Sequence, residues 1–502
     1  MQSQRIIFVV VFKVSKYALS FVFFYLMVLF YAPAVIGIVR FAIAFVAIFS
    51  FIFNLGFNIA HLKIYPEETS KSSSIGTLLS FKAVFICISI CFYYMILSLF
   101  NFDKTITTII IIFIVELIVQ SINTSFSNIL IADNEIIKGS FPWIIISSSK
   151  ILLLVIGLYI YPKNEITLSF IYLLSTILHT AFLLPYILRY NISKPTNSVI
   201  KKYLKFTYPL IFSNIAVLIS GNIGIILINF WISSEAVAFY YAAEHFSVFR
   251  TIIPNVISLV MVSIFAKNIK KGNLEKNKRI IKKITKYSCI LFGAIILLSF
   301  LYSDELILIF LGDVYEPSIF VFNILILAQI FVINDVAVFT DLNARGLTKL
   351  FSAIKIIGEF YKTFLIILFI APNGLNLGIN GLALAILFGN FTYSLLIRII
   401  LWKKYKYGYN FGIILYLFVV LLIFLFNVLV IAMIDFLTYF YLIPLFAILN
   451  IFFYFIILYI LRGIKKEDIR YFKLMLNIKN LVNILYQDLI TRNNKSKKKI
   501  NI

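Results

Sequence analysis

Charged residues are scarce in this chain, at 13% of 502 residues, whereas hydrophobic residues make up 62%. Soluble domains are about one quarter charged and about half apolar, so a soluble globular protein is excluded for most of the chain. Cysteine is almost absent, and Cys87, Cys91 and Cys289 all lie in apolar runs. Three scattered cysteines provide neither a disulfide framework nor the ligand spacing of a zinc site.

The common catalytic and nucleotide-binding motifs are also missing. The sequence has no glycine-rich loop ending in GK[ST], no G-x-S-x-G and no H-E-x-x-H, which excludes the usual ATP site, nucleophile elbow and zinc protease helix. His61, His179 and His245 lack companions at metal-ligand spacing. We therefore expect no enzyme activity, no metal and no cofactor.

Apolar runs long enough to cross a bilayer fill most of the chain, and the mean hydropathy is +1.02. The connections between them are too short to hold a folded soluble domain. We predict an all-α integral membrane protein with about fourteen transmembrane helices. The predicted spans are 15–32, 34–60, 76–101, 106–131, 141–161, 166–188, 207–231, 236–266, 287–311, 315–340, 351–371, 378–397, 411–433 and 437–461.

The positions of lysine and arginine support this division. With the N-terminus placed in the cytosol, 37 of the 45 basic residues fall in segments on the cytosolic side, and only Lys104 and Lys163 fall in segments on the outer side. The other six lie within the predicted spans. Such asymmetry is the positive-inside signal of multi-pass membrane proteins. It explains the net charge of +24, so a nucleic-acid partner is not needed to account for that charge. We expect a cell-membrane protein with both termini cytosolic, in contact with membrane lipids and monomeric.

Two basic hinges, 189–205 and 398–410, divide the predicted helices into groups of six, six and two. We predict a six-helix lobe at 1–190, a second at 207–400, two additional helices at 411–462 and a basic tail at 463–502. The tail includes an amphipathic stretch at 468–490 that fits an interfacial helix. Two halves of equal helix number are typical of a duplicated transporter with its substrate site between them.

One predicted span carries three charges on a single face. Lys355, Glu359 and Lys362 follow one another at i, i+4 and i+7 in "LFSAIKIIGEFYKTFLIILFI" (350–370). A charge at membrane depth costs several kcal/mol, to order of magnitude. Glu359 neutralises one lysine only, so this face should point into a wet cavity. Snorkelling to the cytosolic edge is the alternative for Lys355.

Other spans carry polar residues at similar depth. Together with the three above, the candidate cavity residues are Arg40, Lys82, Lys150, Arg250, Glu116, Glu244, Asn58 and Asn123. The bases outnumber the acids, which favours an anionic guest such as a phosphate or pyrophosphate over a cation. The alternatives are snorkelling for Lys82, a headgroup contact for Arg40, ion pairs between helices for the acids and helix packing for the asparagines. Pro254 is expected to kink its helix and Asp335 to be solvated at the inner edge.

Five segments resemble the polysaccharide and oligosaccharide flippases of the multidrug/oligosaccharidyl-lipid/polysaccharide (MOP) exporter superfamily. They are "FNLGFNIAHLK" (53–63), "SEAVAFYYAAEHF" (234–246), "LIFLGDVYEPS" (308–318), "LNARGLTK" (342–349) and "PNGLNLGINGLALAILFGN" (372–390). The "GF..AH" form of the first resembles archaeal members. Two positions depart from the usual pattern, since Asn54 replaces a frequent aspartate and Ala238 a usual glycine.

This resemblance implies two six-helix lobes around a central cavity that opens alternately to each side. The implied cargo is a lipid-linked glycan, an oligosaccharide on a polyprenyl phosphate or pyrophosphate, moved from the cytosolic to the outer leaflet. A peptidoglycan-precursor flippase and a cation-coupled multidrug exporter share the fold and stay open as alternatives. So does a membrane glycosyltransferase or glycan polymerase, although the expected outer loops are short for one.

Overall fold

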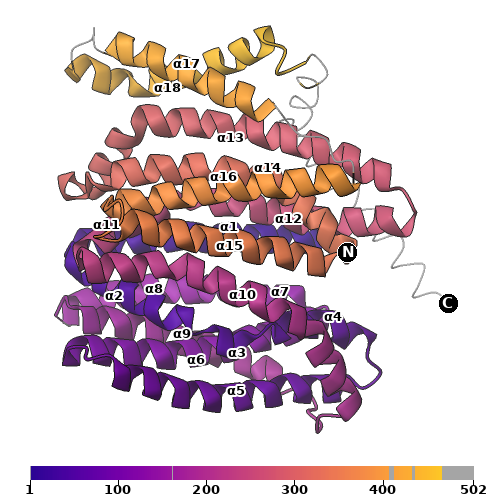
Figure 1. Ribbon diagram of the computed structural model, residues 1–502. Helices are drawn as coiled ribbons and strands as arrows, with labels where there is room; N and C mark the ends of the chain where they lie inside the picture. The colour runs from indigo at the N-terminus through magenta and orange to yellow at the C-terminus, as the bar shows by residue number, and fades with distance from the viewer. Residues whose placement is uncertain (1, 161, 406–411, 432–435, 466–467, 469–502) are drawn as a thin grey trace, which may run out of the picture. The chain divides into compact units, whose positions relative to one another are not determined.

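The structure is a computed structural model, which describes residues 2–160, 162–405, 412–431, 436–465 and 468 (Figure 1). Every regular element in these ranges is a helix, so the predicted all-α fold is confirmed. The helices are α1 (Gln2–Phe30), α2 (Pro33–Ile48), α3 (Phe51–Asn54), α4 (Phe57–Ile64), η1 (Tyr65–Glu67), α5 (Lys71–Leu99), α6 (Lys104–Ala132), α7 (Ile136–Ser140), α8 (Pro142–Ile160), α9 (Glu165–Ile187), α10 (Asn197–Trp231), α11 (Ser234–Phe246), α12 (Phe249–Lys270), α13 (Leu274–Leu311), η2 (Asp313–Tyr315), α14 (Ser318–Ala344), α15 (Thr348–Ile370), α16 (Gly378–Tyr405), α17 (Gly412–Ile431) and α18 (Phe436–Ile460). The predicted interfacial helix at 468–490 lies outside the described residues apart from Asp468.

The helices are long and apolar enough for a multi-pass membrane protein. Eleven meet the length and composition of a span within the described ranges, or twelve when the bent pair formed by α2 and the helices after it counts as one. Two of the fourteen predicted spans do not meet these criteria. One contains α15, which carries Lys355, Glu359 and Lys362, and the other contains α11, which has 13 residues before a break. The number fourteen is compatible with the structure and stays a prediction.

The second predicted span is broken rather than continuous. The helical segments Pro33–Ile48 and Phe51–Glu67 are bent by 48° relative to each other. At the break, the amides of Phe49 and Ser50 donate to carbonyls three residues earlier, as in a tighter 3₁₀ turn. Gly56 follows with φ +88°, a conformation that glycine adopts at little cost.

The predicted kink at Pro254 stays a prediction, and a separate break lies before it in the chain. The structure interrupts the eighth predicted span at Ser247–Val248, between α11 and α12, and Pro254 lies inside α12. The amides of Arg250 and Thr251 donate to Ser247 and Val248, three residues back, at 2.9 and 3.0 Å. Because of this break, Arg250 lies in the first turn of α12.

The chain divides into two compact units. Among the described residues, the first contains those within 2–288 and 302–405, and the second contains those within 289–301 and 412–468. Within the second unit, the Tyr454 hydroxyl donates to the Ile290 carbonyl at 3.0 Å, and Asn427 and Asn450 exchange hydrogen bonds of 2.7 and 2.9 Å. Paired amides of this kind hold helices together in an apolar environment.

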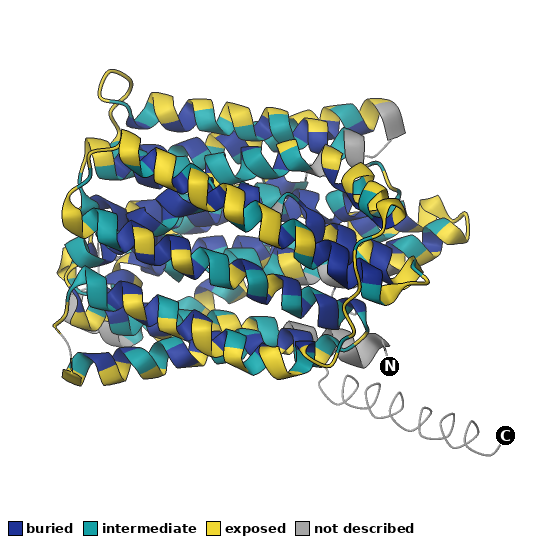
Figure 2. Ribbon diagram, turned by 90° about the horizontal axis from the view of Figure 1, so that it is seen from below, coloured by how far each residue is buried: buried dark blue, intermediate teal, exposed yellow. Residues whose placement is uncertain are grey.

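Apolar side chains cover the outside of the helices as well as their contacts. Figure 2 shows exposed residues recurring along the outer helices, and Leu152, Ile309 and Phe364 are each 59% exposed. In water such surfaces would be a liability, whereas a lipid environment accommodates them. The burial pattern thus supports the assignment of a multi-pass membrane protein.

A polar cluster surrounds Asp133, the residue that directly follows the C-terminal end of α6. The Asp133 carboxylate accepts hydrogen bonds from Tyr65 and Tyr190 at 3.1 Å each and pairs with Lys71 at 3.2 Å. Burial of this carboxyl acts to raise its pKa, but the hydrogen bonds from Lys71, Tyr65 and Tyr190 outweigh burial and hold the pKa below its ordinary 3.8.

We expect this cluster to stabilise the fold above pH 3.8 and to lose its contribution as the pH falls through the depressed pKa of Asp133. The sign follows because the unfolded chain takes up the proton more readily than the folded one. Thermal unfolding of the detergent-solubilised protein between pH 7 and pH 3 measures the effect. The Asp133→Asn variant should lose this part of the acid sensitivity, and an unchanged acid dependence in that variant contradicts the prediction.

Candidate functional site

The candidate site begins where α2 meets α11. At Gly37 an added Cβ would lie 1.7 Å from the carbonyl oxygen of Ser234, so the two backbones nearly touch. Only glycine permits such an approach between helices. One turn further along α2, Arg40 therefore faces the side chains of α11.

At this contact one carboxylate lies between two guanidinium groups. Glu244 Oε2 is 3.2 Å from Arg40 Nη2, and Glu244 Oε1 is 3.5 Å from Arg250 Nη2. The Arg40 guanidinium also lies over the ring of Tyr241, 5.1 Å from its centroid. The three charged groups come from α2, α11 and α12 and carry a net charge of +1.

Both arginines retain unused hydrogen-bond donors. The Nε atoms of Arg40 and Arg250 are buried and have no hydrogen-bond partner among the described residues. The Glu244 side chain, by contrast, is 30% exposed, so it is less enclosed than either arginine. Buried donors without acceptors are costly, so an acceptor that reached these Nε atoms would be stabilising.

A second cluster lies between α10 and α15. The Glu359 carboxylate pairs with Lys362 on its own helix and accepts a hydrogen bond from Ser220 of α10. The stem of Lys362 packs on Gly389 of α16, where an added Cβ would come within 2.8 Å of it. Lys355 forms no ion pair within the described residues, and its ammonium group lies 5.7 Å from the Phe351 ring centroid. As expected from the sequence, Glu359 neutralises one lysine of this face.

A third set of candidates lies inside the first half. Thr176 of α9 donates to Glu116 at 2.8 Å and its carbonyl accepts from Asn123 at 3.0 Å, which links α6 to α9. The Lys150 ammonium lies 3.9 Å from the centroid of the Tyr172 ring. These contacts tie neighbouring helices together.

Two further candidates are buried between helices of the first half. Lys82 is 4% exposed and donates to the Phe53 carbonyl at 2.7 Å and to the Ser121 hydroxyl at 2.8 Å. Asn58 accepts from Ser125 at 3.1 Å. The structure thus brings Arg40, Glu244 and Arg250 into one cluster and Glu359 and Lys362 into another. Lys150 lies on Tyr172, which also borders the gap beside Arg40. The membership of these candidates in a substrate cavity stays a prediction.

One buried ion pair was missed from the sequence. Asp335 of α14, expected to be solvated, is 1% exposed, and its carboxylate accepts from Arg398 Nε at 2.8 Å. Arg398 also donates to the Asn334 carbonyl. The error arose because Arg398 opens the basic stretch 398–410, which suggested a loop, whereas α16 continues to Tyr405. The run of aliphatic residues just after Arg398 was the available signal that the helix goes on.

Replacement of Asp335 by alanine is expected to destabilise the protein by about 3–5 kcal/mol, because it leaves the Arg398 charge buried without a partner. The thermal unfolding midpoint in detergent measures the loss. A double variant, Asp335→Ala with Arg398→Met, should recover most of it, since no buried charge remains. If the single variant is as stable as the wild type, the pair does not have this structural role.

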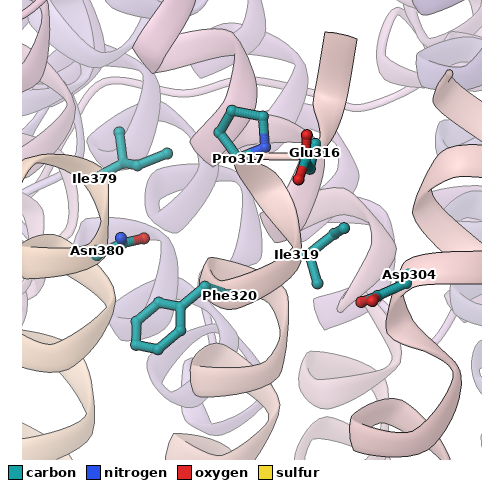
Figure 3. A pocket seen from close by; sticks show the side chains of 7 residues that line it. All are labelled: Asp304, Glu316, Pro317, Ile319, Phe320, Ile379 and Asn380. Carbon is teal, nitrogen blue, oxygen red and sulfur yellow. The ribbon is translucent and has the colours of Figure 1, made fainter. Parts of the chain in front are cut away.

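Two spaces in the structure differ in size and in lining. A gap of about 170 Å³, too narrow for water, lies beside Arg40 and is bordered by Tyr172 and Tyr241. A larger open pocket of about 780 Å³ is lined by Asp304, Glu316, Pro317, Ile319, Phe320, Ile379 and Asn380 (Figure 3). None of the predicted cavity residues lines this larger pocket, and its two carboxylates make it unsuited to an anion.

Comparison with solved structures identifies the fold. The chain is similar to a lipid II flippase, MurJ, in an inward closed conformation, with a TM-score of 0.72 and 14% identity over 89% of this chain and 98% of that one. It is also similar to a multidrug resistance MATE family transporter of the MOP superfamily in two conformations. The inward-facing form gives a TM-score of 0.66 with 15% identity over 78% and 96% of the two chains, and the outward-facing form gives 0.61 with 14% over 80% and 96%. At these identities the likeness shows the fold alone.

Family membership rests on the sequence match. No curated protein matches the chain significantly. A family model described as "Polysaccharide biosynthesis protein" matches residues 3–269, which is just over half of the 502 residues. The resemblance noted from the five sequence segments is thereby confirmed. The chain is a multi-pass membrane protein with the MOP-superfamily fold, and it belongs to the polysaccharide biosynthesis protein family.

Proposed function

We propose that the protein is a flippase that moves an oligosaccharide linked to a polyprenyl phosphate or pyrophosphate from the cytosolic to the outer leaflet. The observation that carries this proposal is the meeting of Arg40 and Arg250, from the two predicted lobes, on one carboxylate. Two guanidinium groups with spare donors suit a phosphate, because a phosphate oxygen accepts charge-assisted hydrogen bonds in a forked arrangement.

Alternating access follows as part of the same proposal. Arg40 belongs to the predicted first lobe and Glu244 and Arg250 to the second, so movement of one lobe against the other changes the distances within the cluster. The sugars would pass between the two lobes, and the lipid tail would stay in the bilayer. The solved MATE structures, described as inward-facing and outward-facing, support the capacity of this fold for both states.

The test is a strain that lacks this protein, in which lipid-linked glycans are analysed separately in each leaflet. Accumulation of complete glycans on the cytosolic face, reversed by the wild-type gene, supports a flippase. Shortened or absent glycans favour the glycosyltransferase or polymerase alternative. Accumulation of a peptidoglycan precursor, or loss of drug export with normal glycans, favours the other two transporter alternatives and overturns the proposal.

Replacement of Lys362 by alanine is expected to reduce glycan export about tenfold while the protein still inserts. A hydrogen bond to a charged group is worth roughly 1.5–3 kcal/mol, and the loss of Lys362 also leaves Glu359 as an uncompensated acid near an anionic guest. Leaflet-resolved glycan analysis at matched expression measures the effect. Lys349→Ala, on the same helix but at its first turn, is the control, and equal export in the two variants would contradict a role for Lys362.

A further inference from the structure

We propose that Glu244 is a built-in competitor for the phosphate group of the cargo, so that it sets both the selectivity of the site and the release of the guest. The proposal rests on the proposed function and goes beyond it. It assigns a role to the carboxylate rather than to the two arginines that would hold the phosphate. Glu244 pairs with Arg40 and Arg250 when the site is empty, and these ion pairs break when a phosphate enters and binds the two arginines.

The geometry of the cluster supports the first half of this exchange. Each oxygen of the carboxylate contacts a different guanidinium, Oε2 with Arg40 at 3.2 Å and Oε1 with Arg250 at 3.5 Å. Glu244 is the more accessible partner, with 30% of its side chain exposed against 16% for Arg40 and 12% for Arg250. A rotamer change of Glu244 alone would therefore break both contacts while the two arginines stay in place.

The unpaired Nε donors of Arg40 and Arg250 explain why a phosphate would displace the Glu244 carboxylate. A carboxylate has two oxygens, and both are already engaged with Nη atoms, so it leaves Nε of Arg40 and Nε of Arg250 unsatisfied. A pyrophosphate has more acceptor oxygens and a larger negative charge, and it can serve Nη and Nε donors together. A guest with a single carboxylate has no such advantage over Glu244, which is tethered at high effective concentration. The site should thus select phosphate over carboxylate.

The same competition favours release. A displaced Glu244 remains beside the guest and repels it, because both are anions. A transporter needs a site that is attractive enough to load yet weak enough to unload, as in other conduction pathways. Return of the carboxylate to the arginines after transfer would prevent rebinding of the guest on the outer side.

The test measures binding of inorganic pyrophosphate by calorimetry to the full-length protein in phosphatidylcholine nanodiscs. Glu244→Gln should bind pyrophosphate at least tenfold more tightly than the wild type, and it should also bind acetate measurably, which the wild type should not. Glu235→Gln is the matched control, since it removes the same charge from an exposed position of α11. Glu244→Asp, which keeps the charge, should show a smaller gain and serves if the glutamine variant does not fold.

A second arm repeats the titration with farnesyl pyrophosphate and measures export. Tighter binding of both probes assigns the effect to phosphate chemistry itself, and tighter binding of farnesyl pyrophosphate alone assigns it to a lipid-borne phosphate. Slower export by Glu244→Gln despite its tighter binding supports the release step. The inference is overturned if the wild type binds pyrophosphate, Arg250→Ala loses that binding and Glu244→Gln leaves it within twofold. Failure of both the wild type and Glu244→Gln to bind either probe overturns this inference and the proposed function together.

Discussion

Replacement of Arg250 by alanine is expected to lower glycan export about 100-fold or more while the protein still inserts into the membrane. Arg250 is largely buried, contacts Glu244 and retains a free Nε donor, so it is poised to engage an anionic guest. Truncation of one partner of a buried, hydrogen-bonded charge pair costs roughly 2–5 kcal/mol, and about 2.7 kcal/mol corresponds to a factor of 100. Lysine is not expected to substitute fully, since it lacks the planar fork of a guanidinium.

The measurement is leaflet-resolved glycan analysis in the strain that lacks the native gene, at matched protein levels. Arg279→Ala provides the control, because Arg279 is an exposed arginine near the start of α13. Normal export by Arg250→Ala, with correct insertion, would show that the arginine pair does not carry the cargo. The proposed function would then lose its main structural support.

Replacement of Gly37 by leucine is expected to force α2 away from α11 and to abolish export. The side chain would begin 1.7 Å from the carbonyl oxygen of Ser234 and 2.5 Å from its carbonyl carbon, and backbone atoms cannot move aside as a flexible side chain can. Overpacking of a tight contact usually costs about 1–3 kcal/mol even when side chains can adjust. Separation of the two helices would also lengthen the contact between Arg40 and Glu244.

Thiol labelling measures this separation. In a background with Cys87, Cys91 and Cys289 replaced by serine, a Val237→Cys substitution places a thiol on α11 at a fully buried position. It should stay unlabelled with glycine at 37 and become labelled with leucine there. Gly221→Leu is the matched control, because nothing lies within 4 Å of the Cβ position at that helical glycine. Equal protection of the thiol in both leucine variants would show that the contact at Gly37 tolerates the larger side chain.

The local prediction of α15 shows how far sequence reasoning reached. The period of 3.6 residues places Lys355, Glu359 and Lys362 on one face, and the structure pairs Glu359 with Lys362 one turn apart. Such neighbours are close in sequence, so helix geometry alone brings them together. The identity of the third partner, Ser220 of α10, could not be predicted, because its approach depends on how α10 packs against α15.

The helix ends and breaks were harder to predict than the helices. Lys403 and the basic residues after it suggested that a loop begins at Arg398, yet α16 extends to Tyr405. The break at Ser247–Val248 was not predicted. Composition averages over a window and therefore blurs boundaries. The Asp335–Arg398 pair was missed for this reason, since both residues were assigned to the solvated edge.

By itself the sequence determined the class of the protein. The scarcity of charge, the length of the apolar runs and five family segments were sufficient for an all-α membrane transporter fold, because crossing a bilayer requires helices of a certain length and composition. Only the tertiary structure decided which charges meet. Arg40 and Glu244 are 204 residues apart, and their contact exists because Gly37 lets two backbones approach. Contacts between distant helices depend on packing of whole surfaces, and no local pattern in the chain encodes them.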